Sequence, residues 1–194
     1  MKKQYSIFAS QLGFFLLLPI WMKLISYLHP VVIVVVWTVF TVTFCMIAFL
    51  ITKQTVTLAS TWLHVVMSLY TISLFILLFF RPENQQYGTI NLIPFETIRF
   101  YFTGHVSSLI AFYNLSANIG LFIPFGLYYR FISKTPRLIL LLCISILSIS
   151  IVESLQYATK RGSLDIDDLI LNVIGFCIGY FLFTFVQKVV HLKR

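Results

Sequence analysis

Apolar residues occur along this chain in six long runs separated by short polar stretches. The runs cover residues 7–28, 31–51, 62–80, 109–129, 138–157 and 169–189. Each run has about 20 residues, the length that an α-helix needs to cross the hydrocarbon core of a bilayer. The pattern therefore predicts an all-α fold: a polytopic membrane helix bundle with about six transmembrane helices.

The composition indicates that lipid is the solvent of this chain. Of its 194 residues, 59% are hydrophobic and 10% are charged, whereas about one quarter of the residues of a soluble domain are charged. A water-soluble fold of this size could not bury so many Phe, Leu, Ile and Val side chains. The composition excludes a soluble enzyme, a disordered chain and a free nucleic-acid binder. We expect membrane lipids, and no nucleic acid, as partners.

Charged residues are distributed unevenly between the two sides of the predicted bundle. If the N-terminus is cytoplasmic, nine basic residues lie on the cytoplasmic side: Lys2, Lys3, Lys53, Arg130, Lys134, Arg137, Lys188, Lys193 and Arg194. Four lie on the opposite side: Arg81, Arg99, Lys160 and Arg161. This bias predicts that both termini are cytoplasmic. The carboxylates all fall on or near the other side: Glu83, Glu96, Glu153, Asp165, Asp167 and Asp168. Any chemistry of this chain is therefore expected to face away from the cytoplasm.

The longest polar stretch, at residues 81–108, lies between the third and fourth runs. It still contains apolar and aromatic side chains, among them Leu92, Phe95 and Tyr101. Aromatic rings suit the headgroup region of a bilayer. We therefore expect this outer segment to be re-entrant or to lie at the membrane interface.

Polar residues of the last two runs fall on helical stripes. Glu153 and Gln156 are three positions apart and share a helix face. A second stripe, with steps of four, three and four residues, consists of Asp168, Asn172, Gly175 and Gly179. Its two glycines permit the close approach of another helix.

Four motifs of the chain occur in a fixed order. They are NLIPF at 91–95, NIGLFIPFG at 118–126, ESLQ at 153–156 and DIDDLILNVIG at 165–175. In this order and spacing the motifs resemble those of the VanZ-like family, and Arg161 falls where that family usually carries a basic residue. The resemblance divides the chain into two extra N-terminal transmembrane helices (1–60) and a VanZ-like four-helix membrane domain (61–190).

The resemblance also implies a place in the cell. It indicates a multi-pass protein of the bacterial plasma (inner) membrane that is associated with the cell envelope. The founding member of the family is linked to lowered susceptibility to the glycopeptide antibiotic teicoplanin. The family implies no established catalytic mechanism, so the question of enzyme activity stays open, as does the oligomeric state.

A binding function is the first hypothesis. A pocket between the fourth, fifth and sixth runs, roofed by residues 81–108, would bind an amphiphile at the outer leaflet, either a lipid-linked envelope precursor or a lipid-tailed glycopeptide. Arg99 and Arg161 would bind a phosphate or sugar-phosphate head by bidentate hydrogen bonds. The candidate ligand-binding residues are Asn91, Glu96, Arg99, Asn118, Glu153, Gln156, Arg161, Asp165, Asp168 and Asn172.

The alternative is an intramembrane, metal-assisted hydrolase or transferase acting on an envelope lipid. Glu153 would be its catalytic acid–base group, and Asp165, Asp167 and Asp168 would hold a divalent cation. No other cofactor is expected. Purely structural roles are open for the same residues: the aspartates as a helix N-cap, and Glu153 as an ion-pair partner of Arg99 or Arg161.

Overall fold

The computed structural model describes residues 2–24, 32–79, 89–104 and 106–193. The chain forms two compact units. The first unit comprises residues 1–58 together with 184–193, and the second comprises residues 59–183. Residues 29–30, between the first two apolar runs, and the polar residues 81–88 lie outside the described residues.

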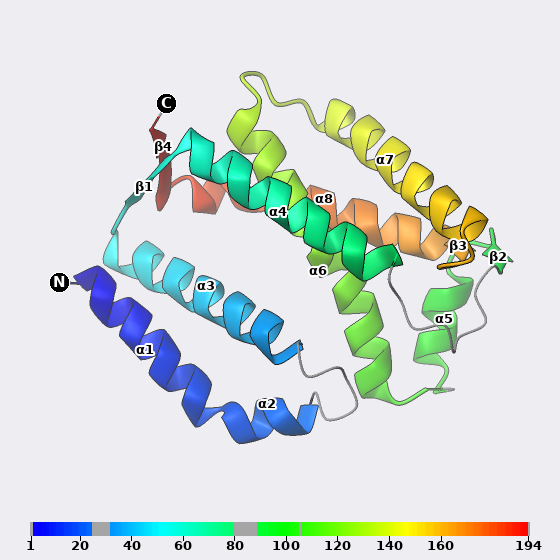
Figure 1. Cartoon of the computed structure of the whole chain (residues 1–194), viewed down its shortest axis with the longest axis horizontal. Coiled ribbons are helices and arrows are strands. Elements are labelled where there is room, and N and C mark those ends of the chain that lie inside the picture. Colours follow the sequence, from blue (N-terminus) through cyan, green and yellow to red (C-terminus); the bar gives the residue numbers. More distant parts are fainter. Residues whose placement is uncertain (1, 25–31, 80–88, 105, 194) are drawn as a thin grey trace. The chain divides into compact units, whose positions relative to one another are not determined.

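The first unit is a helical hairpin with a short strand pair. Its elements are α1 (Lys2–Leu16), α2 (Leu18–Leu24), α3 (Val32–Thr52), β1 (Val56–Ala59) and β4 (Val190–Lys193). Helices α1 and α3 lie side by side (Figure 1), and β1 pairs with β4. A polar contact joins the two helices, because the indole Nε1 of Trp37 donates to Gln11 Oε1 over 2.6 Å.

The prediction of one continuous helix over residues 7–28 is wrong. The chain breaks at Leu17, between α1 and α2. Pro19 is the second residue of α2, and proline has no N–H to donate while its ring clashes with the carbonyl four residues earlier. The amides of Ile20 and Trp21 both bond instead to the carbonyl of Leu17, each over 3.0 Å. Pro19 therefore indicates the break locally, whereas the hydropathy pattern does not.

The second unit contains the long helices that follow the first unit in sequence. Its elements are α4 (Ser60–Phe79), β2 (Ile90–Asn91), α5 (Glu96–Phe102), α6 (Ser108–Ile132), α7 (Leu138–Ala158), β3 (Leu164–Asp165) and most of α8 (Ile166–Val186). Helices α4, α6, α7 and α8 are each long and apolar enough to cross a membrane. Only 11% to 28% of each apolar window is buried, so most of its side chains face outward, as lipid-facing side chains do. The all-α membrane bundle is confirmed, although the count of six spans is not.

One face of α7 forms much of the core of this unit. Its buried residues recur every three or four positions: Leu141, Ser145, Ile149, Glu153 and Gln156. Leu141 and Ile149 pack in a cluster with Leu74 of α4, Phe122 of α6 and Phe176 of α8. The same face therefore turns from apolar to polar toward the C-terminal end of α7, which brings two polar side chains into the bundle.

Helices α6 and α8 approach each other closely along a line of glycines. A Cβ on Gly175 would overlap with the carbonyl oxygen of Ile119, and one on Gly179 would overlap with that of Ile123. A Cβ on Gly126 would overlap in the same way with the carbonyl oxygen of Phe176. The glycines of the predicted α8 stripe therefore face a helix, as expected.

Candidate functional site

The candidate site lies where β2, β3, α5 and the starts of α6 and α8 meet at one end of the second unit. Strands β2 and β3 are parallel and only two residues long, with Asn91 opposite Asp165. Asp165 Oδ1 accepts from the Asn91 side chain over 3.3 Å, and its Oδ2 accepts from Thr97 Oγ1 over 2.6 Å. Oδ1 also accepts from the amide of Asp167 over 2.9 Å. Asp165 therefore joins the start of α8 to both β2 and α5.

Asp167 caps a helix other than its own. Its side chain is fully buried. One carboxylate oxygen accepts from the amide of Phe95, and the other accepts from the amide of Ile98 over 3.0 Å. These amides lie at the N-terminus of α5, where helical N–H groups lack partners and negative charge is favoured. Phe95 has a left-handed backbone (φ 67°) and no side-chain capping bond, so the cap comes from α8.

Asp168 faces the opposite way, toward α6. Its Oδ1 accepts a short hydrogen bond from the side-chain amide of Asn118. The glycine contacts of α6 and α8 continue from this pair along both helices. Neighbouring aspartates of one helical turn therefore bind two different elements: Asp167 binds α5, and Asp168 binds α6.

Two buried acceptor oxygens in this region have no hydrogen-bond partner among the described residues. They are Glu153 Oε1 of α7 and Asn172 Oδ1 of α8. Glu153 is 5% exposed and Asn172 is 8% exposed. The backbone amide of Asp165 bonds to the Glu153 carboxyl, and Asp165 and Asp168 interact with it electrostatically. Burying an acceptor without a donor is costly, so these two atoms are the unsatisfied part of the site.

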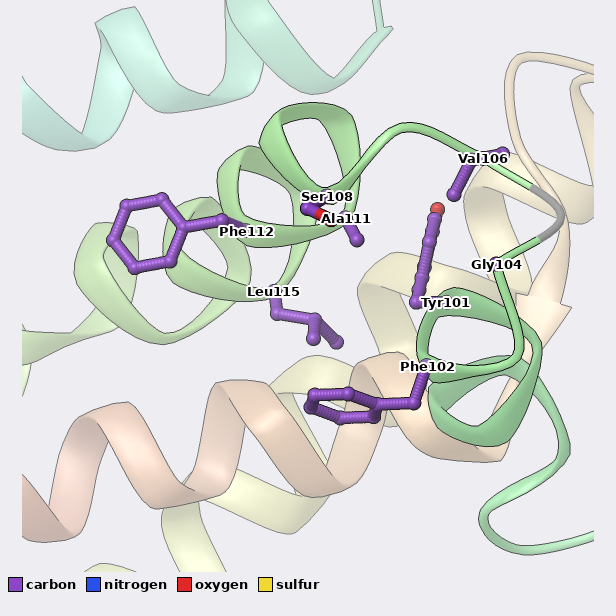
Figure 2. Close-up of a pocket in the computed structure, with 8 residues that line it drawn as sticks. All are labelled: Tyr101, Phe102, Gly104, Val106, Ser108, Ala111, Phe112 and Leu115. Atoms are coloured by element: carbon purple, nitrogen blue, oxygen red, sulfur yellow. The ribbon is translucent and has the colours of Figure 1, made fainter.

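An apolar cavity of about 280 Å³ lies between α5 and the first turns of α6. Figure 2 shows Phe102 of α5 and Leu115 of α6 pointing toward one another across it, with the ring of Tyr101 also on the α5 side. Burial raises the pKa of the Tyr101 phenol above its ordinary value of 10, and the carboxylates of Asp168 and Asp165 raise it further. Tyr101 therefore lines the cavity and also interacts electrostatically with the two carboxylates.

Comparison with known families decides what kind of protein carries this arrangement. A family model described as VanZ/LLP1 matches residues 62–187, which is more than half of the chain. The chain belongs to the VanZ/LLP1 family. A search of curated proteins and a search of solved structures each found no match.

The VanZ/LLP1 region contains every residue of the candidate site, but the structure does not bring all of them together. Asn91, Asp165 and Asp167 form the α5 attachment, whereas Gln156 donates to the carbonyl oxygen of Leu78 at the end of α4 over 3.1 Å. Arg161 is half-buried directly after α7. The structure therefore assigns several candidate residues to contacts between elements.

The two candidates on α5 lie at the surface. Glu96 and Arg99 are both exposed. An ion pair of Glu153 with Arg99 or Arg161 stays a prediction. The charge of Arg99 is available to solvent or to headgroups rather than to the buried carboxylates.

The predicted cation site at the aspartates finds no support in the geometry. Within the described ranges, no three His, Cys, Asp or Glu side chains are grouped so that they could hold a metal ion. The carboxylates of Asp165 and Asp167 accept hydrogen bonds from neighbouring elements on both of their oxygens. Asp165 instead has the capping role of the structural alternative, since it accepts from the amide of Asp167 at the start of α8.

Two residues of the site were not among the predicted ones. Thr97 links Asn91 to Asp165, accepting from the first over 3.0 Å and donating to the second. Tyr101 forms part of the cavity wall. No sequence motif indicates a hydrogen bond between residues about 70 positions apart; only the positions of Thr97 and Tyr101 on α5, within the expected outer segment, could have suggested them.

Proposed function

We propose that this VanZ/LLP1 protein binds an amphiphile at the outer leaflet of the bacterial plasma membrane, with its apolar tail in the α5–α6 cavity. The supporting observation is the apolar cavity itself, whose wall includes Tyr101, a residue that also interacts electrostatically with Asp165 and Asp168. Small-molecule sites combine apolar walls with a few polar groups that orient the ligand. The cavity is slightly smaller than a typical site of that kind, which suits a segment of a lipid tail.

The unsatisfied oxygens suggest the chemistry of the head group. Glu153 Oε1 and Asn172 Oδ1 are hydrogen-bond acceptors. A hydroxyl or amino group of a ligand would satisfy them, whereas a phosphate would add further acceptors. A glycan-bearing envelope lipid precursor or a lipid-tailed glycopeptide provides such donors. In this proposal Arg99, at the exposed face of α5, and the half-buried Arg161 bind the anionic portions of the head.

The orientation follows from the basic residues in sequence. The positive bias of the chain termini and of the α6–α7 connection supports an orientation with both termini in the cytoplasm. The polar end of the second unit then faces outward, toward the compartment where envelope lipids and glycopeptides meet. The family link to glycopeptide resistance fits this orientation.

Native mass spectrometry of the gently purified protein tests the proposal. We expect a bound amphiphile in the wild type and its loss in Ala111→Phe, because Ala111 is buried in the cavity wall and a phenyl ring would fill the space. The control is Ser116→Phe, which adds the same ring at an exposed position of α6. Equal retention in both variants would contradict the tail site.

Head-group recognition is tested separately. Glu153→Gln replaces one acceptor oxygen of the carboxylate with an NH₂ group, which cannot accept a hydrogen bond from the ligand. We therefore expect weaker retention of the amphiphile. Ser154→Ala, at the next and exposed position of α7, serves as the control. Unchanged binding by Glu153→Gln would show that the head group lies elsewhere, while the cavity result would stand.

A susceptibility assay in a sensitive bacterial host examines the link with resistance. Expression of the wild type is expected to protect the host against a lipid-tailed glycopeptide but to leave it sensitive to a glycopeptide without a tail. Ala111→Phe should remove the protection, and Ser116→Phe should retain it. Equal protection against both compounds would overturn binding through the tail. No observation favours the hydrolase alternative.

A further inference from the structure

Arg130, at the other end of the second unit, lies in an unusual environment for a cation. It lies in the last turn of α6, and its guanidinium carbon is 4.7 Å from the ring centre of Tyr180 and 4.8 Å from that of Phe183. Its Nε is buried and has no hydrogen-bond partner among the described residues. The guanidinium is therefore held by two aromatic faces of α8, while its Nε–H has no acceptor among the described residues.

The surrounding structure fixes this arrangement. The Tyr180 hydroxyl donates to the carbonyl oxygen of Pro136 over 3.2 Å. The Tyr129 hydroxyl donates to the carbonyl oxygen of Arg137 and accepts from its amide, both over 3.1 Å. The α6–α7 connection is thus tied to α6 by one tyrosine and to α8 by the other. Arg130 is consequently preorganised rather than a freely moving surface side chain.

The described carboxylates lie far from this cation. Asn118 is bonded to Asp168 at the polar end, and Arg130 lies twelve residues further along α6, or about 18 Å at 1.5 Å per residue. The short connection after α6 instead adds Lys134 and Arg137, both exposed. The result is a cluster of three positive charges, in which the buried Nε–H of Arg130 has no acceptor among the described residues.

We propose that Arg130, Lys134 and Arg137 bind the phosphate of an anionic phospholipid at this end of the second unit. Aromatic rings engage the face of a guanidinium, and the N–H groups at its edge match the oxygens of a phosphate. Arg130 lies at the end of a membrane-spanning helix, so a lipid headgroup reaches it without leaving the bilayer. Basic pockets between transmembrane helices bind anionic headgroups in this way.

This site is separate from the proposed amphiphile site. The two lie at opposite ends of α6 and prefer opposite charges: the polar end carries Asp165, Asp167 and Asp168, and the Arg130 end carries none of the described carboxylates. The lipid would anchor the ends of α6 and α8 at the membrane boundary. Its loss should leave binding at the α5–α6 cavity unchanged.

Titration of the purified full chain with phosphatidylglycerol, monitored by native mass spectrometry, tests this inference. We expect binding of phosphatidylglycerol to exceed that of phosphatidylcholine and to fall about tenfold in Arg130→Gln. Lys160→Gln, which removes an exposed positive charge at the polar end, should bind like the wild type. Equal binding of the two lipids, or equal losses in both variants, would overturn the proposal.

Two further arms address folding and the source of the phosphate. The double variant Lys134→Gln/Arg137→Gln changes only exposed side chains, and we expect it to weaken phosphatidylglycerol binding severalfold without lowering the unfolding temperature. No change in that variant would contradict the cluster. Millimolar inorganic phosphate should not displace the lipid; displacement would show that the site takes free phosphate and would overturn the assignment to a phospholipid.

Discussion

The Asp167 cap of α5 yields the sharpest prediction about this fold. Asp167 is fully buried and accepts from the amides of Phe95 and Ile98, one on each carboxylate oxygen. Asp167→Asn keeps the shape and one acceptor, but it removes the charge and turns an amide N–H₂ toward one of the two N–H donors. The substitution should therefore loosen α5 from the start of α8.

The magnitude follows from the two bonds. A hydrogen bond to a charged group contributes about 1.5–3 kcal/mol, so the loss of one such bond in Asp167→Asn should cost about 2 kcal/mol. Since 1.36 kcal/mol corresponds to a factor of ten, the protection of the α5 amides against hydrogen exchange should fall roughly 30-fold. Asp167→Ala removes both acceptors, and its loss should be about 3 kcal/mol or roughly 100-fold.

Hydrogen-exchange mass spectrometry of residues 93–104 in detergent or nanodiscs measures this loss. Asp168→Asn is the matched control, because the adjacent carboxylate accepts its hydrogen bond from Asn118 of α6. The reasoning would be refuted by unchanged α5 protection in both Asp167 variants. An equal loss in the Asp168→Asn control would also refute it, because the effect would then reflect the acidic cluster in general.

Three further predictions concern the rest of the second unit. Gly175→Ala should lower the unfolding temperature in detergent because its Cβ would overlap with α6 backbone, whereas Gly120→Ala, where a Cβ meets open space, should not. In a difference absorbance titration against Tyr101→Phe, the Tyr101 phenol should ionise above pH 10, and Asp168→Asn should lower the pKa of this phenol. Because the pKa is raised in the folded protein, the stability that the neutral phenol contributes is lost as the pH rises through its folded-state pKa. Gln156→Leu should cost about 1–2 kcal/mol by leaving a buried α4 carbonyl unpaired, as denaturant unfolding would show.

Much of the fold could be predicted from the amino-acid sequence alone. Continuous apolar runs near 20 residues predict helices in lipid, because an apolar solvent requires every backbone group to be satisfied within its own segment. The spacing of Gly175 and Gly179 likewise predicts a helix contact on one stripe. The limit of this reasoning appears at Leu17, where Pro19 interrupts a run that hydropathy treats as continuous.

The contacts within the site depended on tertiary structure more than the helices did. The sequence by itself determined that the carboxylates gather near one end of the last two spans, since helical period and span length place them there. It could not determine that Asp167 caps α5 while Asp168 binds α6, because adjacent residues on a helix point about 100° apart and the neighbours of each depend on packing. Nor could it show that Glu153 Oε1 and Arg130 Nε have no hydrogen-bond partner in the part of the chain that the structure describes, since an unmade hydrogen bond depends on everything that surrounds the atom.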